Sequence, residues 1–297
     1  MEWWQAIILG LVEGITEYLP VSSTGHLIIT TELMRFDEAV RPHVDAFNIV
    51  IQGGAILAVA GLYFPRIVQM LKGFVGKDDA GRRLLINLFV AFLPAAVFGV
   101  LLDSTIQKYL FSTWPVLAAL FAGGIWMIWL DRWRGRHLIE EKAEGVPEEQ
   151  SRFCMDVDDL TWKHALTIGF LQCVAMWPGT SRSMMTIAGG TLIGLKPRAA
   201  AEFSFLLGLP TLGGACVYKL GRNLQESAER GEPNMFEALG TLPLVLGLVV
   251  ATFSAAMAIK WLVAFLTKHG LSAFGWYRIA LCIVLGSLVA AGLVQVG

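Results

Sequence analysis

Six long apolar stretches constrain this chain more than any other feature. They cover residues 47–64, 84–102, 114–130, 199–220, 242–266 and 274–296. A helix needs about 20 mostly apolar residues to cross a bilayer. The chain is 55% hydrophobic and 16% charged, whereas soluble domains are about 45–50% apolar and about 25% charged. The sequence therefore predicts an all-α polytopic membrane protein with six transmembrane helices.

Two further apolar segments are unsuited to simple spanning. Residues 3–33 are interrupted by Glu13, Glu17 and Pro20, and residues 165–195 by Pro178 and Arg182. A charged side chain at the bilayer centre costs about 2.5–3.5 kcal/mol even on the permissive insertion scale. Broken backbone at membrane depth is tolerated only inside protein or beside a water-filled cavity. We expect two re-entrant helix hairpins, over residues 1–36 and 162–196.

The two interrupted segments resemble each other. The first reads GLVEGITEYLPVSSTGH from Gly10, and the second reads GFLQCVAMWPGTSRS from Gly169. The alignment pairs Gly10 with Gly169, Glu13 with Gln172, Glu17 with Met176 and, after a one-residue gap, Pro20 with Pro178 and Ser23 with Ser181. This similarity suggests an internal duplication.

Three spans follow each hairpin, and an odd number inverts the second copy. A single membrane domain, 1–297, then comprises repeat one at 1–131, a polar loop at 132–161 and repeat two at 162–297. In inverted repeats, binding sites form near mid-membrane between broken helices. We predict an inverted-topology repeat whose two hairpins meet.

The basic residues indicate an orientation. The connections on the side of loop 66–83 carry 14 lysines and arginines, the other side carries 6, and three of the 23 lie in apolar segments. Cytoplasmic loops are enriched in such residues, so we place the N-terminal hairpin and the C-terminus on the external side. The net charge of −1 gives no indication of nucleic-acid binding, and four scattered cysteines predict no disulfide framework or zinc site.

The first hairpin carries a carboxylate pair. Glu13 and Glu17 are four residues apart and share one helix face. Two such anions in a low dielectric share a proton, find a cation or bind a metal. A divalent cation, Mg²⁺ or Ca²⁺, suits paired carboxylates and phosphate oxygens. The alternative is a proton-coupled pair of the kind found in transporters.

Hydroxyl groups gather at the break of the first hairpin. Ser22, Ser23 and Thr24 follow Pro20, and His26 lies one turn beyond Ser23. The free N–H groups of a new helix favour an anion such as phosphate. Simple N-capping is the alternative, but it accounts for only one hydroxyl.

The second hairpin supplies a cation. Arg182 is flanked by Thr180, Ser181 and Ser183, and its planar fork suits a phosphate. The alternative for Arg182 is an internal salt bridge to Glu13 or Glu17. We expect Arg278, after Trp276 and Tyr277, to extend to the membrane interface instead. The predicted phosphate-binding set is Ser22, Thr24, Thr180, Ser181, Arg182 and Ser183.

These motifs resemble a known family. The Glu13-x-x-x-Glu17 pair, the run Pro20–His26 and the block Pro178–Ser183 are similar to the signature regions of bacterial undecaprenyl-diphosphatases of the bacitracin-resistance type, and so are 198–205 and 276–278. The resemblance implies hydrolysis of undecaprenyl diphosphate in the bacterial inner membrane, recycling the lipid carrier of cell-wall synthesis. It also implies divalent-metal dependence and a functional set of Glu13, Glu17, Ser23, His26 and Arg182.

Phosphoryl transfer then follows as the expected chemistry. Ser23 would attack the terminal phosphorus, Glu17 or His26 would take its proton, and Arg182 with a metal at Glu13 and Glu17 would neutralise charge. Attack by His26 or by water stays open. A transporter or flippase of an anionic prenyl lipid is the alternative function, but transport gives no reason for clustered hydroxyls beside a histidine. The oligomeric state is open, with a homodimer as one option.

Overall fold

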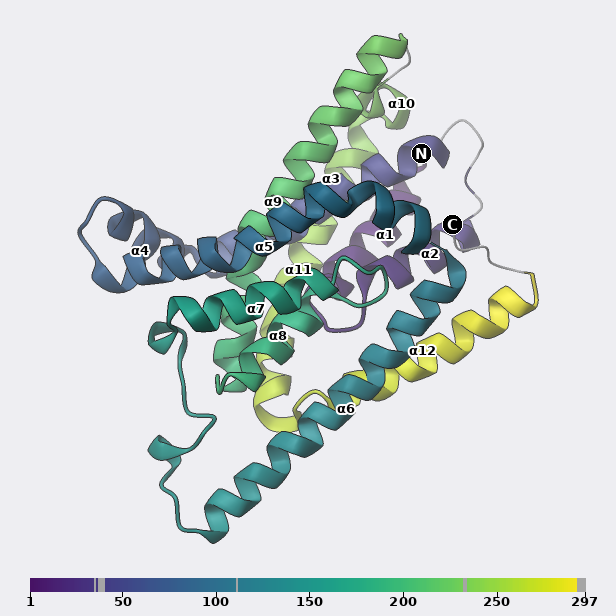
Figure 1. The fold of residues 1–297 in the computed structure, drawn as a ribbon. Coiled ribbons are helices and arrows are strands. Elements are labelled where there is room, and N and C mark those ends of the chain that lie inside the picture. Colours follow the sequence, from purple (N-terminus) through teal and green to yellow (C-terminus); the bar gives the residue numbers. More distant parts are fainter. Residues whose placement is uncertain (35, 37–40, 111, 232–233, 293–297) are drawn as a thin grey trace.

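The computed structural model describes residues 1–34, 36, 41–110, 112–231 and 234–292, and the regular elements within these ranges are helices (Figure 1). The first half contains α1 (Trp3–Thr16), α2 (Ser23–Met34), α3 (Arg41–Leu62), α4 (Phe64–Phe74), α5 (Asp79–Leu110) and α6 (Thr113–Ala143). Two short 3₁₀ turns, Glu148–Gln150 and Val157–Asp159, lie in the connection between the halves. The second half contains α7 (Trp162–Val174), α8 (Arg182–Leu192), α9 (Pro197–Arg230), α10 (Met235–Leu239), α11 (Thr241–His269) and α12 (Ser272–Ala290).

Length and hydropathy make this a polytopic membrane protein. Helices α5, α6, α9, α11 and α12 are each long and apolar enough to cross a bilayer. The pair Ala46–Leu62 and Phe64–Phe74 qualifies as a sixth span when taken together, although its two helices are bent by 77°. The predicted span at 47–64 therefore ends at Leu62, and α4 is a helix that the sequence analysis missed. Pro65 in the first turn of α4 explains the new start, because proline fits that position and breaks a continuing helix.

The predicted polar loop at 132–161 is wrong over its first part. Helix α6 continues to Ala143, beyond its apolar section, because residues such as Leu138, Glu140 and Lys142 favour a helix without burial. This polar end of α6 projects away from the other helices in Figure 1. The last predicted span, 274–296, is a helix as far as Ala290, and its final residues, 293–296, lie outside the described residues. Arg35, near the end of the predicted first hairpin, also lies outside them.

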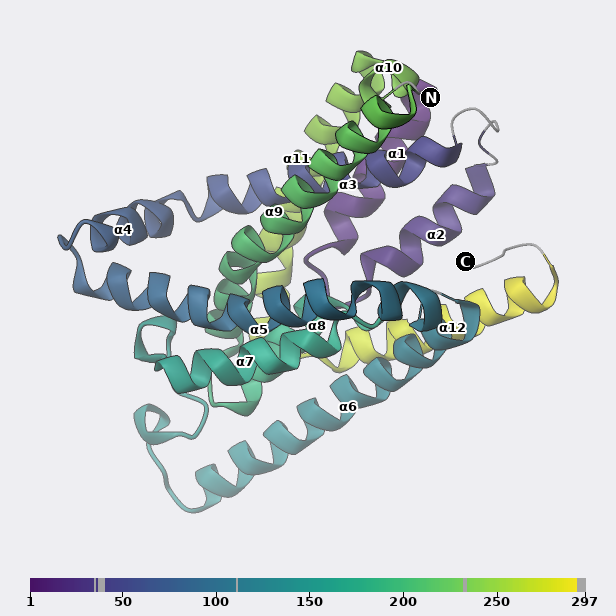
Figure 2. The ribbon, with the colours of Figure 1, turned by 45° about the horizontal axis from the view of Figure 1, so that its top comes forward.

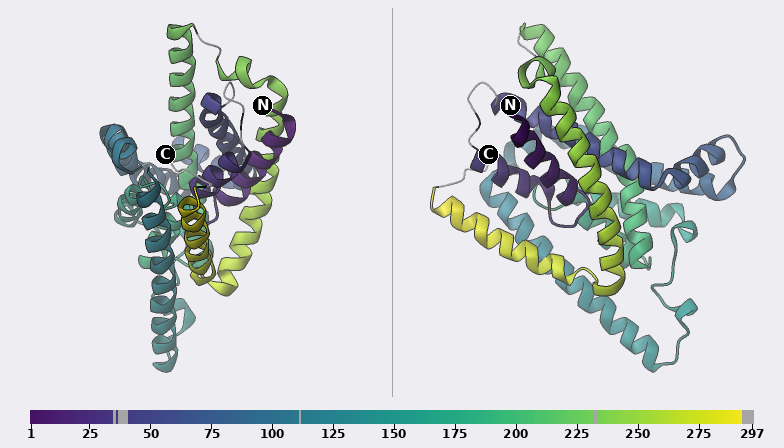
Figure 3. Two further views of the ribbon diagram at one scale, coloured as in Figure 1. Left: turned by 90° about the vertical axis from the view of Figure 1, so that its right-hand side faces the viewer. Right: turned by 180° about the vertical axis from the view of Figure 1, so that it is seen from behind.

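Each half packs a hairpin helix against the long helix of the other half. Helix α1 packs along α11, and α7 packs along α5; Figure 3 shows α1 beside α11 from behind. Glycine permits both approaches, since a Cβ on Gly10 would lie 2.6 Å from the Gly247 carbonyl oxygen and one on Gly169 would lie 2.5 Å from that of Ala91. Corresponding helices from the two halves also pair with each other, α3 with α9 and α6 with α12 (Figure 2).

The two hairpins differ in how deeply their second helices are buried. Nine residues of α8, Ser183 through Thr191, are buried, and the neighbours of this helix are α6, α7 and α9. In α2 only Gly25 is buried. The main hydrophobic core therefore surrounds the second hairpin, while the first lies at its edge.

Candidate active site

The breaks of both hairpins line one pocket of about 160 Å³. Its lining comprises Glu17, Ser22, Ser23, Thr24, Gln52, Ala175, Pro178, Gly179, Ser181, Arg182 and Leu212. The predicted meeting of the two breaks is thus confirmed. Of the residues selected from the sequence, six reach this lining, and Glu13, His26, Thr180 and Ser183 do not.

Two serines build the breaks in the same way. Ser22 and Ser181 have φ values of 72° and 75°, a left-handed conformation that residues other than glycine rarely adopt. Each hydroxyl accepts a hydrogen bond three residues on, Ser22 from the Gly25 N–H at 3.5 Å and Ser181 from the Met184 N–H at 3.3 Å. Capping therefore accounts for one hydroxyl in each hairpin.

The structural equivalence of these serines corrects the sequence alignment. Ser22 and Ser181 are 159 residues apart, the same spacing that separates Glu13 from Gln172. No gap is needed, and Ser23 corresponds to Arg182 rather than to Ser181. The gap was wrong because it was introduced to match Pro20 with Pro178, which lie before the breaks. The residues that correspond are the left-handed serines that form the breaks.

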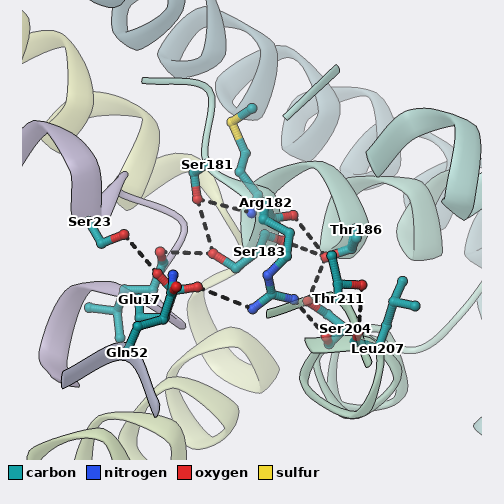
Figure 4. A network of polar contacts seen from close by, with 12 residues as sticks. Glu17, Ser23, Gln52, Ser181, Arg182, Ser183, Thr186, Ser204, Leu207 and Thr211 are labelled. Carbon is teal, nitrogen blue, oxygen red and sulfur yellow. Dashed lines mark hydrogen bonds and ion pairs between the residues drawn. The ribbon is translucent and has the colours of Figure 1, made fainter. Parts of the chain in front are cut away.

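Glu17 connects the two hairpins (Figure 4). Its Oε2 accepts a hydrogen bond from the Ser23 hydroxyl at 2.8 Å, and its Oε1 lies 3.6 Å from Nη2 of Arg182. The salt bridge considered for Arg182 is therefore present, with Glu17 as the partner. A hydroxyl donating to a buried carboxylate is the arrangement of a nucleophile beside its general base.

Arg182 is held so that part of its fork stays free. Nη1 donates to the Ser204 carbonyl at 2.9 Å, and the Tyr18 ring lies 5.5 Å from the guanidinium carbon. Gly208 leaves room for the group, because a Cβ there would lie only 3.2 Å from Nη2. Nε and Nη2 are buried, and neither has a hydrogen-bond partner among the described residues, although Nη2 forms the longer ion pair with Glu17. Two unused guanidinium donors beside a pocket suit a phosphate oxygen.

Glu13 lies behind the pocket. It is 1% exposed, and its Oε2 has no hydrogen-bond partner in the part of the chain that the structure describes. Buried polar atoms normally have partners, so this oxygen is consistent with a cation. Among the described residues no group of three or more His, Cys, Asp and Glu side chains could hold a metal. A divalent ion held by Glu13 and Glu17 would therefore need further ligands from phosphate or water.

His26 is engaged away from Glu17. Its Nδ1 lies 2.8 Å from the Ser22 carbonyl oxygen, and its Nε2 lies 2.7 Å from the Tyr277 hydroxyl. Neither contact involves Ser23, so the structure brings Glu17, and not His26, to the candidate nucleophile.

The second block contributes backbone more than hydroxyls. The Ser183 hydroxyl donates to the Leu19 carbonyl at 2.9 Å, and the Thr180 carbonyl accepts from Nη1 of Arg278 at 2.9 Å. The expectation that Arg278 extends to the interface is wrong: the residue is 0% exposed and binds backbone carbonyls. Four such acceptors, two in the break of the second hairpin and two within α6, outweigh the desolvation cost that favoured the interface.

The sequence analysis missed two neighbours of Arg182 and Glu17. Gln52 of α3 lines the pocket, and Tyr18 lies under the guanidinium. A signal existed for Gln52, which with Asn48 is one of two side-chain amides in the apolar stretch 47–64. No local signal indicated Tyr18, since an aromatic residue after Glu17 fits any membrane segment.

Comparison with known proteins places this architecture in a family. Residues 6–284 match the family model described as bacitracin resistance protein BacA. A relative from Sorangium cellulosum, named undecaprenyl-diphosphatase, is 43% identical over 95% of this chain and 84% of its own. Relatives of the same name from Pseudomonas putida strain F1 (43% identity, 94% of this chain and 92% of that protein) and Nitrosospira multiformis (38%, 99% of both) also match. This chain belongs to the bacitracin resistance protein BacA family.

Proposed function

We propose that this protein hydrolyses undecaprenyl diphosphate to undecaprenyl phosphate and inorganic phosphate, and so recycles the lipid carrier of cell-wall synthesis. Relatives that match nearly the whole chain are named for this activity. One observation carries the proposal: the Ser23 hydroxyl donates to Glu17 in a pocket beside the free donors of Arg182. The predicted resemblance to the family is confirmed.

In the proposed reaction, the Ser23 oxygen attacks the terminal phosphorus while Glu17 accepts the hydroxyl proton. The bond from that phosphorus to the bridging oxygen breaks, and undecaprenyl phosphate leaves with the bridging oxygen. Water then attacks the phosphoserine, releases inorganic phosphate and restores the Ser23 hydroxyl. The 2.8 Å hydrogen bond supports Glu17 as the base. The two contacts of His26 support a positioning role for its ring.

Charge neutralisation is the other part of the mechanism. Arg182 would bind the transferring phosphoryl group through Nε and Nη2, which have no hydrogen-bond partner among the described residues. Binding there would weaken the 3.6 Å ion pair with Glu17 and leave that carboxylate freer to accept the proton. Glu13 and Glu17 would hold a divalent ion, Mg²⁺ or Ca²⁺. When bound, this ion would neutralise negative charge on the diphosphate.

We further propose six spans and two re-entrant hairpins in an inverted repeat. The helix order of the two halves, the 159-residue spacing of the left-handed serines and the exchanged packing of α1 and α7 support it. The membrane would be the bacterial inner membrane, with the pocket open to the external side, as the 14-to-6 distribution of basic residues indicates. A homodimer stays a prediction.

Purified protein in detergent provides the direct test. No gradient exists there, so a pure transporter releases no phosphate. We expect release of one phosphate per undecaprenyl diphosphate, with undecaprenyl phosphate as the lipid product. Binding of the lipid without phosphate release, in the presence of Mg²⁺ or Ca²⁺, would reject the proposed hydrolysis.

A further inference from the structure

Tyr277 of α12 forms a hydrogen bond with the His26 ring. Nδ1 of His26 faces the Ser22 carbonyl oxygen at 2.8 Å. Because a carbonyl only accepts, this contact assigns a proton to Nδ1. In the neutral ring Nε2 is then an acceptor, and the Tyr277 hydroxyl donates to it at 2.7 Å. The two rings are also parallel, with centroids 5.7 Å apart and an interplanar angle of 1°.

Arg278, the next residue, holds the other hairpin. Nη2 donates to the Gly179 carbonyl at 2.7 Å and Nη1 to the Thr180 carbonyl at 2.9 Å. The same guanidinium donates to the carbonyls of Ala119 and Leu120 in α6, at 3.0 Å and 3.3 Å. It therefore fixes the turn that directly precedes Ser181 and Arg182 to the second turn of the long helix α6.

The helix that carries both residues is itself firmly seated. Near their level α6 and α12 approach so closely that a Cβ on Gly275 would lie 2.6 Å from the Gly124 carbonyl oxygen. At the start of α12, Asp131 of α6 accepts hydrogen bonds from the Ser272 N–H at 3.1 Å and hydroxyl at 2.6 Å. The α6–α12 pair can thus serve as a fixed reference for groups that bind to it.

We propose that Tyr277 and Arg278 are positioning residues that hold the two hairpin breaks in register, Tyr277 through the His26 ring and Arg278 through the Gly179 and Thr180 carbonyls. The inference builds on the proposed function, because the register matters where Ser23 and Arg182 act on one phosphate. It assigns α12 a part in catalysis although neither residue lines the pocket.

The physical reason lies in the weak burial of α2. Only Gly25 of that helix is buried, so packing alone fixes Ser23 poorly relative to Arg182. The hydrogen bond from Tyr277 of α12 to His26, which lies one turn after Ser23, supplies this restraint. A displacement near 1 Å at a reacting atom can cost about 100-fold in rate.

Tyr277→Phe is the first test, since it removes one hydroxyl from a half-exposed side chain. We expect kcat for phosphate release to fall roughly tenfold, the effect of one lost hydrogen bond, with KM changed less than about threefold. Trp276→Phe, on the exposed neighbour, is the matched control and should retain wild-type kcat. Equal kcat for Tyr277→Phe and wild type would overturn the role of Tyr277.

A double-mutant cycle separates positioning through His26 from general packing. If Tyr277 acts through His26, Tyr277→Phe should have almost no further effect in a His26→Ala background. Additive losses would overturn the inference. The ¹⁵N resonance of His26 Nε2 in histidine-labelled protein gives a readout without activity: it should shift in Tyr277→Phe and not in Trp276→Phe. An unshifted resonance in Tyr277→Phe would reject this inference, whatever the activity of the protein. Absence of phosphate release by the wild type would reject the proposed function and would leave the resonance test unaffected.

Arg278→Lys tests the second half of the pair. An ammonium keeps the charge but cannot reproduce a fork that reaches four carbonyls. We expect a fall in kcat of about tenfold or more with lipid binding largely retained. Wild-type kcat in Arg278→Lys would show that Arg278 stabilises the fold without positioning the turn.

Discussion

The two hairpins share a backbone plan but differ in chemistry and burial. Each break is formed by a left-handed serine, Ser22 or Ser181, whose hydroxyl caps the next helix. The following residue is Ser23 in one hairpin and Arg182 in the other, a hydroxyl opposite a cation. In both hairpins the side chain that follows the left-handed serine lines the same pocket. One repeated turn can therefore supply both partners of the proposed phosphoryl-transfer site, the hydroxyl and the cation.

Burial divides the two roles further. The cation belongs to α8, in which nine residues are buried, whereas the hydroxyl belongs to α2, in which one is buried. Segments with few buried apolar contacts open at lower free-energy cost. We therefore expect the second hairpin to act as the fixed phosphate-binding half and the first as the adjustable reactive half.

Among the substitutions, the largest expected effect comes from removing the candidate nucleophilic hydroxyl. Ser23→Ala should reduce kcat for phosphate release by about 10³-fold or more, with lipid binding nearly unchanged, since the group acts in the transition state. Thr30→Ala, which removes another α2 hydroxyl, one bonded to the His26 carbonyl, is the control for helix stability. Substantial turnover by Ser23→Ala, or a trapped phosphohistidine at position 26, would transfer the role of nucleophile to His26.

The cation of the fixed hairpin should be the next most sensitive position. Arg182→Lys retains charge but loses the planar fork, so we expect kcat/KM to fall about 100-fold. Arg222→Lys, at an exposed ion pair on α9, should have no effect. Near-wild-type kcat/KM in Arg182→Lys would reduce Arg182 to a structural or screening charge and weaken the division between the hairpins.

Metal dependence tests the carboxylate pair, which only the first hairpin has. Chelation should abolish phosphate release, and added Mg²⁺ or Ca²⁺ should restore it. Glu13→Gln should raise the metal concentration for half-maximal rate by about tenfold, because it removes one of two anionic ligands. Full activity in chelator would show that Glu13 and Glu17 work without a metal and would direct attention to a shared proton.

The smallest effect on kcat/KM is expected from a substitution at Gly208, which packs against the Arg182 guanidinium. A Cβ added at Gly208 would lie 3.2–3.3 Å from the guanidinium atoms, so Gly208→Ala should displace the fork slightly and lower kcat/KM about fivefold. Thermal stability should not fall, since alanine favours a helix interior over glycine. Gly214→Ala on the same helix has open space around it and is the matched control. Equal losses in both variants would mean that helix α9, and not the Arg182 position, responds to the added methyl.

Sequence patterns were sufficient for the membrane class and for most of the polar residues that line the candidate pocket. Hydropathy marks spans because lipid imposes the same requirement on every segment, and Glu17, Ser23 and Arg182 were identifiable as polar groups in otherwise apolar hairpins. The extent of α6 and the existence of α4 were not predicted, since helices whose ends leave the apolar region carry no hydropathy signal.

The sequence by itself determined that this protein lies in a membrane, that a broken apolar segment precedes the spans of each half, and that carboxylates, hydroxyls and an arginine occur at or near the breaks. Only the tertiary structure decided the partners: Ser23 bonds Glu17, while His26 bonds Tyr277, 251 residues away, and Arg278 is turned inward onto the second hairpin. Residue type and spacing indicate the free-energy cost of placing a polar group in lipid, and this cost depends only on the residue and its neighbours in the sequence. Pairing depends on which distant helices pack together, and no local pattern contains that information.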